Sequence, residues 1–597
     1  MERRTAIFLA LFAIALPLFA QKTSGTLAGV IVRNGVAIDA AKVELRRGTV
    51  VVAQAVAHDG RFRLEAPAGR YQLYVDGAPS REVVISPGIV SGIEETPNRD
   101  AESPLFVTTF DAKLLEKLPL DSTFEAPYYL TPGTTRVSNY GGTTALAFVD
   151  GSGVLPLALP VEFTESAVAK SAAYGAEYGR ATGGIIDVVT RNAIAPINAT
   201  AFVYYKTRAH DYGRTNGGVT VGGPLVRDRL FAFAGIDHDR MDAPLDDGTR
   251  HHFTDDEVLV KADYLVSPRA NVSASTISRN RTRTTAANAS FVSGNTTFDA
   301  TASQFELPGS PYETDLVRLG ATHSLGNHVI RAGGEDLRAD HVVYSPYTGG
   351  PVPPALPYFV KKSRPAFWVA DTWRAGNSIV VNGGIRSQSA FGDTHWEPRL
   401  AVMWQPADGA VHLSASHGVY TAEQVVGYLS VQPVHESTDT TAEVSLPRSG
   451  VALRVIHRDI DIANHTVTDP RVVTGTIHYD GAELEFARRF NDTWIRATYV
   501  RGHHDSPFVG DADVDTVKLI ATTTIAKLDL GATATYESAV PFLDYSPYDS
   551  SATRIDFRAA YRVLESLTLI ADAVNLTDDE TRFYARRSLR AGIRWRL

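Results

Sequence analysis

One pattern constrains this chain more than any other: from about Ala199 onward, apolar and polar residues alternate with a period of two. The apolar series is clear in three late segments: Leu528, Leu530, Ala532, Ala534 and Tyr536; Ile555, Phe557, Ala559, Tyr561 and Val563; and Leu589, Ala591, Ile593, Trp595 and Leu597. Successive side chains of a strand point to opposite faces, so the pattern predicts many strands with one apolar and one polar face. Such strands suit a soluble sandwich or a transmembrane barrel, and the period alone does not separate the two.

The first residues predict export. Arg3 and Arg4 precede an apolar run that ends at Phe19, and Ala20 is followed by the polar Gln21. This order is typical of a secretory signal peptide over residues 1–20, with cleavage between Ala20 and Gln21. The apolar run is too short to span a bilayer as a helix, and no Cys follows it to carry a lipid. We therefore expect an exported protein without membrane helices.

Composition and motifs exclude several classes of function. The chain has no Cys, so disulfides, thiolate metal sites and Cys nucleophiles are excluded. A formal net charge of −9 gives no basic field of the kind that nucleic-acid binders show. HExxH, GxSxG and P-loop motifs are absent. We expect no enzyme activity, no catalytic residue, no cofactor and no nucleic-acid partner.

Two histidine pairs are the remaining candidate metal ligands, His251 with His252 and His503 with His504. Neighbouring residues of a strand point to opposite faces, so such a pair does not easily hold one ion. We interpret both pairs as exposed loop histidines. The sequence therefore predicts no metal site.

Turn signals divide the chain before the long alternating region. Residues 21–93 carry short alternating runs broken by Asp59-Gly60 and Pro67-Ala68-Gly69, which predict a small β-sandwich. Residues 94–104, EETPNRDAESP, are polar with two Pro and predict a linker. Residues 105–195 and 196–597 remain as two further units, the second of which holds the alternation.

Two observations favour a barrel over a string of soluble sandwiches. The exported chain continues its alternation to the last residue without cysteines or domain linkers. In lipid every backbone polar group needs an internal partner, so an embedded sheet must close between its first and last strands. The chain ends in such a strand, and we expect Leu589, Ile593, Trp595 and Leu597 to face lipid and to matter for barrel assembly.

Several stretches carry a family likeness. Residues 171–193, SAAYGAEYGRATGGIIDVVTRNA, resemble the end of the plug domain of TonB-dependent outer-membrane receptors. Residues 217–239, GGVTVGGPLVRDRLFAFAGIDHD, are similar to an early barrel hairpin of that family. The runs GTLAGVIV, AAKVEL and DGRFRLEAPAGRYQLYV resemble its carboxypeptidase-regulatory-like domain, a non-catalytic accessory. The plug motif then comprises Asp150, Gly151, Tyr174, Gly175, Glu177, Tyr178, Gly179, Arg180, Gly183 and Gly184.

The resemblance implies a mainly β fold: an antiparallel outer-membrane barrel of about 22 strands, filled by a plug and preceded by a small periplasmic β-sandwich. Such a barrel needs roughly 240 residues in strands, which residues 196–597 can supply. The implied function is energised uptake of a scarce nutrient. The implied partners are the TonB energy-coupling protein at the inner membrane, outer-membrane lipid, the barrel-assembly machinery and an unknown small-molecule ligand.

The chain departs from the family pattern in its shorter length, its final Leu597 where Phe is usual, and the lack of a clear TonB-interacting box. The best candidate box is Leu105, Phe106, Val107, Thr108 and Thr109, and the same residues could instead be the first strand of the plug. The alternative function is therefore a non-transporting barrel that acts as an adhesin or structural surface protein. An outer-membrane hydrolase has almost no support. Iron chelates, vitamins, oligosaccharides and peptides all remain open as ligands.

Overall fold

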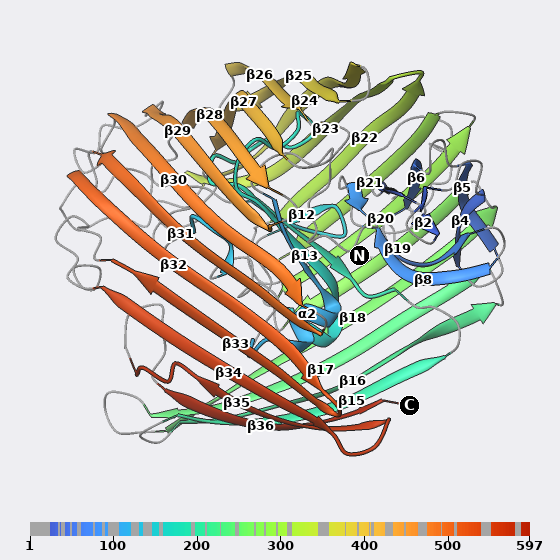
Figure 1. The fold of residues 1–597 in the computed structure, drawn as a ribbon, viewed down its shortest axis with the longest axis vertical. Helices are drawn as coiled ribbons and strands as arrows, with labels where there is room; N and C mark the ends of the chain where they lie inside the picture. The colour runs from blue at the N-terminus through green and yellow to red at the C-terminus, as the bar shows by residue number, and fades with distance from the viewer. Residues whose placement is uncertain are drawn as a thin grey trace.

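The computed structural model describes residues 24–92, 107–120, 130–134, 146–154, 159–192 and 197–596, with short gaps between strands inside the first and last ranges. Regular structure in these ranges is nearly all β (Figure 1). The predictions for Ala20, Gln21, Leu105, Phe106 and Leu597 lie outside the described residues. None of the described helices is long and apolar enough to cross a membrane.

The N-terminal segment folds into small sheets around one core. A three-stranded sheet contains β6 (Arg61–Pro67), β1 (Ser24–Val30) and β9 (Val90–Gly92), and a four-stranded sheet contains β5 (Val50–Val56), β4 (Lys42–Arg47), β7 (Gly69–Val75) and β8 (Ala78–Ile85). The short β2 (Val32–Arg33) and β3 (Val36–Ala37) pair with each other. Both larger sheets contribute to one apolar cluster, which includes Leu27, Leu45, Phe62 and Leu73. The sequence predicted a small β-sandwich over residues 21–93.

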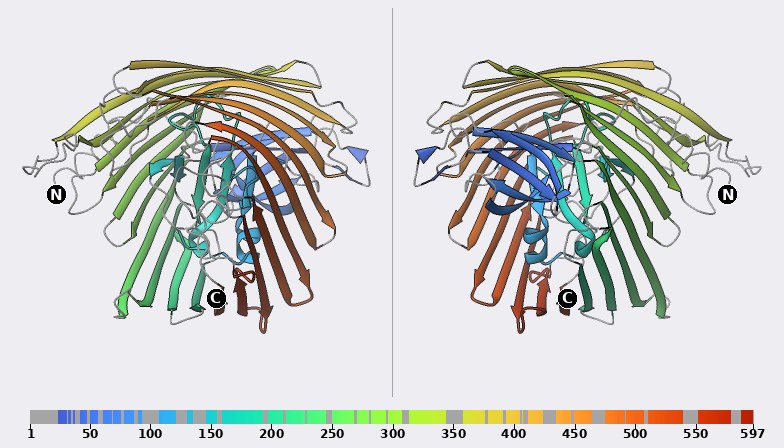
Figure 2. Two further views of the ribbon diagram at one scale, coloured as in Figure 1. Left: turned by 90° about the vertical axis from the view of Figure 1, so that its left-hand side faces the viewer. Right: turned by 90° about the vertical axis from the view of Figure 1, so that its right-hand side faces the viewer.

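A second, separate sheet has the strand order β10 (Val107–Asp111), β13 (Thr164–Lys170), β14 (Ile185–Thr190), β11 (Leu146–Val149) and β12 (Ser152–Val154). The helix α2 (Ala112–Lys117) follows β10, and Asp111 caps it by accepting from the backbone N of Leu114 at 2.7 Å. The short 3-10 helix η1 (Val161–Phe163) precedes β13. Figure 2 shows these elements enclosed by the long outer strands in both side views. We call them the plug.

A closed barrel of 22 antiparallel strands surrounds the plug. Its strands are β15 (Asn198–Arg208), β16 (Tyr212–Val226), β17 (Leu230–Pro244), β18 (Arg250–Ser267), β19 (Ala270–Arg279), β20 (Thr282–Ser293), β21 (Thr296–Glu306), β22 (Glu313–Leu325), β23 (His328–Val343), β24 (Tyr358–Ala375), β25 (Ile379–Ala390), β26 (Asp393–Trp404), β27 (His412–Glu423), β28 (Val434–Leu446), β29 (Val451–Ala463), β30 (Gly475–Phe490), β31 (Thr493–Ser506), β32 (Gly510–Ile525), β33 (Leu528–Glu537), β34 (Ala552–Arg562), β35 (Leu567–Val574) and β36 (Ser588–Arg596). The last strand pairs with the first, with Trp595 opposite Ala201. The expected closure between first and last strands is thus confirmed.

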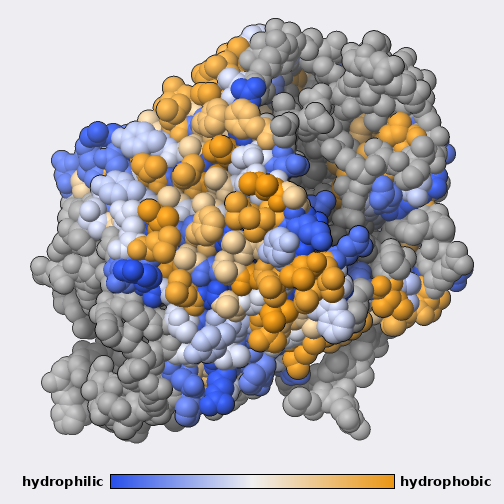
Figure 3. Space-filling view, turned by 60° about the horizontal axis from the view of Figure 1, so that its bottom comes forward, coloured by the Kyte–Doolittle hydropathy of each residue, from blue (hydrophilic) through white to orange (hydrophobic). Residues whose placement is uncertain are grey.

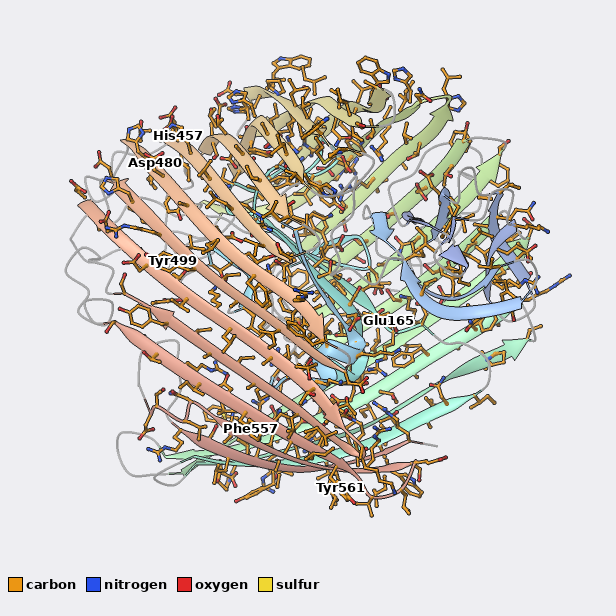
Figure 4. The ribbon with its side chains drawn as sticks, viewed as in Figure 1. Glu165, His457, Asp480, Tyr499, Phe557 and Tyr561 are labelled. Carbon is orange, nitrogen blue, oxygen red and sulfur yellow. The ribbon has the colours of Figure 1, made fainter. Side chains whose placement is uncertain are left out.

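The two faces of each strand meet different surroundings. In β36 the side chains of Leu589, Ile593 and Trp595 are exposed on the outside, whereas Arg590 and Arg594 are buried. Figure 3 shows apolar residues gathered over the outer surface of the barrel. In Figure 4, Glu165 of β13 lies inside the barrel, and Phe557 and Tyr561 lie on the wall strand β34. An apolar exterior around a polar interior is the arrangement of a membrane-spanning barrel.

The plug and the wall share one apolar core on one side of the molecule. Phe163 and Val188 of the plug belong to the same buried cluster as Phe231, Phe233 and Leu259 of the wall. Smaller apolar clusters join them elsewhere, for example Ala172 with Ile456 and Tyr174 with Tyr420. In the described residues β9 ends at Gly92 and β15 begins at Asn198. The expected domain boundaries at 93/94, 104/105 and 195/196 lie outside the described residues.

Candidate functional site

The predicted plug motif includes a buried segment, residues 171–184, that joins β13 to β14. Arg180 and Gly184 have positive φ values of 64° and 104°, and at Gly184 the missing Cβ avoids the strain that a side chain would bring. Gly183 beside it is buried. Gly179 has another constraint, because a Cβ there would lie 2.2 Å from Arg386 Nε of the wall. The segment, called the latch loop below, is therefore shaped by its close approach to the barrel.

One carboxylate of the barrel, Glu335 on β23, holds the latch loop. Arg180 Nε of the plug lies 3.1 Å from Glu335 Oε1, and Arg318 Nε of β22 lies 3.0 Å from Glu335 Oε2. Arg386 of β25 pairs with the same carboxylate. All four side chains are buried. In such a cluster, removal of one partner is costly because it leaves buried charges uncompensated.

Arginines of the wall also donate hydrogen bonds to the backbone of the latch loop. Arg399 Nη1 of β26 lies 3.3 Å from the carbonyl oxygen of Tyr174 and 2.6 Å from that of Tyr178. Arg318 Nη2 lies 2.5 Å from the carbonyl oxygen of Glu177. These charge-assisted bonds fix the path of the backbone itself. The wall therefore holds the loop along its length.

Aromatic contacts reinforce the same attachment. The ring of Tyr174 packs on Tyr420 of β27, with ring centroids 4.5 Å apart, and its hydroxyl donates to the carbonyl oxygen of Ala181 at 2.5 Å. Arg399 lies over the Tyr420 ring at 4.4 Å and also donates to the carbonyl oxygen of Gly175. The predicted motif residues Tyr174 and Gly175 thus meet the wall directly.

The predicted turn at Asp150 and Gly151 is a second attachment. Asp150 has a positive φ of 50°, and its backbone N donates to the carbonyl oxygen of Val188 at 2.9 Å. Its carboxylate accepts from the backbone N of Thr190 at 2.9 Å, and Lys261 Nζ of β18 lies 3.2 Å from Oδ1. One side chain therefore ties the turn both to β14 and to the barrel.

Two titratable groups are buried in the plug sheet beside the latch loop. Lys170 Nζ donates to the hydroxyl of Tyr178 at 2.5 Å. Burial lowers the pKa of Lys170 from 10.5 to about 8. Burial likewise raises the pKa of Asp187 from 3.8 to about 6, against the attraction of Lys170 and Arg318. Both charges therefore cost stability near neutral pH.

We expect the plug sheet to be least stable between pH 6 and 8, where both groups are charged. The stabilising contribution of protonated Asp187 is complete below its ordinary pKa of 3.8 and is lost as pH rises through about 6. For Lys170 the folded state holds its proton less tightly, so stability rises again from about pH 8 to 10.5. Hydrogen exchange of β13 and β14 measures this profile. The Asp187→Asn variant should lack the acid-side change, and a flat profile in the unmodified protein would refute the expectation.

A second cluster between plug and wall was missed by the sequence reasoning. Glu162 of η1 accepts from the Tyr204 hydroxyl at 2.6 Å and from Arg594 Nη2 at 2.7 Å. Glu116 of α2 pairs with Arg191 at 2.7 Å. Burial raises the pKa of Glu116, but the surrounding arginines, Arg594 foremost, outweigh burial and hold this pKa well below its usual range. The alternation in the last strand indicated which of its residues face lipid, but it carried no sign of these ion pairs.

The structure places Val107, Thr108 and Thr109 of the candidate TonB-interacting segment in β10, at the edge of the plug sheet. This strand pairs with β13, and Arg496 Nη2 of the wall donates to the Thr108 hydroxyl at 3.0 Å. These three residues thus occupy the position of a first plug strand, which was the other interpretation of the segment.

The histidine pairs lie in strands, so the expectation of loop histidines is wrong. His503 on the outer face lies 3.0 Å from Asp513, and His504 is buried against Tyr479 with ring centroids 4.8 Å apart. His252 pairs with Asp242 on the exposed side of β18. The cause is that the strands continue into polar sequence that resembled loops. Among the described residues, no group of three or more His, Asp or Glu side chains is arranged to hold a metal ion.

Solved structures share this architecture, although no protein-family model and no curated protein sequence matches the chain. The siderophore receptor PirA from Pseudomonas aeruginosa matches with a TM-score of 0.65 at 16% identity, over 83% of this chain and 100% of that chain. A mutant form of the ferric enterobactin receptor PfeA from the same organism matches with a TM-score of 0.66 at 13% identity, over 83% and 99%. The FrpB iron transporter from Neisseria meningitidis gives 0.63 at 12%, over 83% and 100%. The chain has the fold of TonB-dependent outer-membrane receptors, a 22-strand barrel around a plug.

Proposed function

We propose that this protein is a TonB-dependent receptor of the bacterial outer membrane that takes up a scarce nutrient, with its N-terminal sandwich in the periplasm. The observation that carries the proposal is the attachment of the plug by a buried ion-pair hub at Glu335. The plug is a separate sheet, and no described plug strand pairs with a barrel strand. It can therefore move without opening the wall.

The two sides of the plug suggest how such a movement proceeds. The latch loop is held by charge pairs and hydrogen bonds, which water can replace at a modest net cost once the segment is hydrated, and by smaller apolar contacts such as Tyr174 on Tyr420. The opposite side packs through Phe163 into an apolar core with Phe231 and Phe233, which water replaces poorly. In this mechanism a pull from the TonB protein releases the latch loop first and leaves the apolar side in place.

Iron chelates are the first ligand class to test, because the similar solved structures include a siderophore receptor and an iron transporter. Vitamins, oligosaccharides and peptides complete the panel. A deletion strain should fail to grow on one limiting nutrient of the panel, and the cloned gene should restore growth only when the energy-coupling protein is present. Restoration without that protein would contradict energised uptake.

An adhesin or structural surface protein is the second candidate, and one observation favours it. The segment that would contact the coupling protein is occupied by pairing with β13 from Val107 onward. In that case the deletion strain grows normally on every nutrient of the panel and instead loses surface attachment. The growth panel therefore separates the two functions.

The candidate coupling segment, Leu105 to Thr109, has a direct test. Val107→Pro removes a backbone donor and fixes φ, so it should prevent strand pairing with the coupling protein. We expect surface binding of the nutrient to persist and energised uptake to stop, with the barrel still assembled. Normal uptake by an assembled variant would exclude the segment as the contact. Loss of both binding and assembly would show that Val107 serves the plug core alone.

A further inference from the structure

A group of four carboxylates lines the inner face of the barrel on two neighbouring strands. Asp237 of β17 lies directly opposite Glu257 of β18, and Asp239 lies directly opposite Asp255. Residues two apart on a strand share one face, so the four side chains form two neighbouring cross-strand pairs on that face, called the square below. This square is distinct from the Glu335 hub and takes no part in the proposed function.

Two of the four carboxylates have arginine partners. Arg214 Nε of β16 donates to both oxygens of Asp239, at 2.8 and 2.7 Å. Arg279 Nε of β19 donates to Asp255 at 2.6 Å. These charge-assisted bonds supply one cation to each carboxylate in this half of the square, although Asp255 Oδ1 has no partner among the described residues. Four carboxylates thus face two guanidinium groups.

The other two carboxylates, Asp237 and Glu257, lack a cation of this kind. Asp237 accepts one hydrogen bond, from Asn216 Nδ2 at 2.7 Å, and no described residue donates to Glu257. Both side chains are deeply buried, with exposed fractions of 5% and 4%. Asp237 Oδ1 and Glu257 Oε1 have no partner in the described part of the chain. Buried, opposed and unpaired carboxylates are costly unless a proton or a cation compensates them.

The pair lies beside the plug. A Cβ at Gly235, two residues before Asp237 on the same face, would lie 2.5 Å from Phe163 Cε1. The nearby plug carboxylate Glu162, which Arg594 and Tyr204 hold, places a further negative group near Asp237 and not a compensating cation. The four carboxylates of the square and their two arginine partners therefore leave two negative charges uncompensated.

We propose that Asp237 and Glu257 bind one hydrated divalent cation of the Mg²⁺ or Ca²⁺ class between β17 and β18. The ligand atoms are carboxylate oxygens, which these hard cations prefer. Mg²⁺ in particular is commonly held by one or two carboxylates while it keeps several water ligands, so a two-carboxylate site suffices. One divalent cation neutralises Asp237 and Glu257, and the hydrogen bond from Asn216 orients the Asp237 carboxylate.

The test uses the full mature chain, refolded in detergent free of lipopolysaccharide so that no bound lipid contributes metal. After treatment with a chelator, calorimetric titration with Mg²⁺ and with Ca²⁺ should show one saturable site per chain for at least one of the ions. The double variant Asp237→Asn, Glu257→Gln should show no saturable binding. Asn216→Ala should weaken binding by about 10- to 100-fold, as expected for a residue that orients a ligand.

The matched control is Asp256→Asn, which removes a carboxylate from the same strand on the outer face, where it pairs with His238. This variant should bind like the unmodified protein. Absence of saturable binding in the unmodified, assembled protein would overturn the proposal and leave a shared proton as the compensating charge. Unchanged binding in the assembled double variant would also overturn it.

Discussion

The Glu335→Ala variant should loosen the plug by about 3–5 kcal/mol, the range found when one partner of a buried ion cluster is removed. Arg180, Arg318 and Arg386 would remain buried around a missing carboxylate. Like charges would then repel, and the latch loop would lose its strongest attachment. Hydrogen exchange of residues 171–184 in the assembled receptor should rise, while exchange in the barrel strands should stay unchanged.

The neighbouring carboxylate provides the control. Asp336 faces the outside of the same strand, where Arg338 Nε lies 2.8 Å away and the Ser363 hydroxyl lies 2.6 Å away. Because it does not touch the plug, Asp336→Asn should cost no more than about 1 kcal/mol, as surface ion pairs do. Equal exchange of the latch loop in both variants would show that the Glu335 hub does not hold the plug.

Removal of residues 595–597 should sharply reduce the folded form of the barrel. Trp595 pairs with Ala201 of β15 and with Leu567 of β35. The deletion therefore shortens the pairing of β36 with both of its neighbouring strands at once. A barrel with an open edge exposes unpaired backbone groups to lipid, which is costly. The measurement is the fraction of heat-modifiable protein in the outer membrane, where a folded barrel migrates faster before boiling than after it.

The conservative variant Trp595→Phe distinguishes the effect of the lost strand pairing from the effect of the lost indole ring. It keeps an aromatic, lipid-facing side chain at the same position and should assemble nearly as well as the unmodified chain. Normal assembly of the truncated chain would show that these residues are dispensable for closure.

The strands of the wall were largely predictable from sequence, because the direction of each side chain depends only on its place in the local alternation. In the last strand, Leu589 and Trp595 alternate with Arg590 and Arg594, and this period fixes which side chains face outward. His503 was wrongly interpreted as a loop residue, because β31 continues through polar residues beyond the apolar surface. Polarity alone does not end a strand.

For the contacts between plug and wall, the sequence indicated the plug residues but not their partners in the wall. The likeness of residues 171–193 to a plug end pointed to Arg180 and Gly179, yet nothing near them indicates Glu335 or Arg386. Those partners lie more than a hundred residues away along the chain, and their pairing depends on the register and closure of the whole barrel. A period of two says that Glu335 faces inward, but it does not say which plug residue it meets.

In the proposed function the plug moves against the wall during uptake, and a reversible cross-link between the two tests this movement. A Cβ at Gly384 of β25 would lie 3.0 Å from the Cβ of Ala176 in the latch loop and 2.9 Å from the Cβ of Ala370 in the wall, so a side chain there must displace its neighbours slightly. A disulfide spans Cβ atoms about 3.5–4.5 Å apart, so a small adjustment permits one. The chain has no Cys of its own, so the pair Ala176→Cys, Gly384→Cys is unambiguous.

Uptake of the nutrient identified by the growth panel is measured with this pair oxidised and then reduced, with each single Cys variant as a control. We expect the oxidised receptor to bind the nutrient at the surface without importing it, and reduction of the disulfide to restore import. Import at the normal rate through the fully cross-linked receptor would show that uptake does not require this movement of the plug.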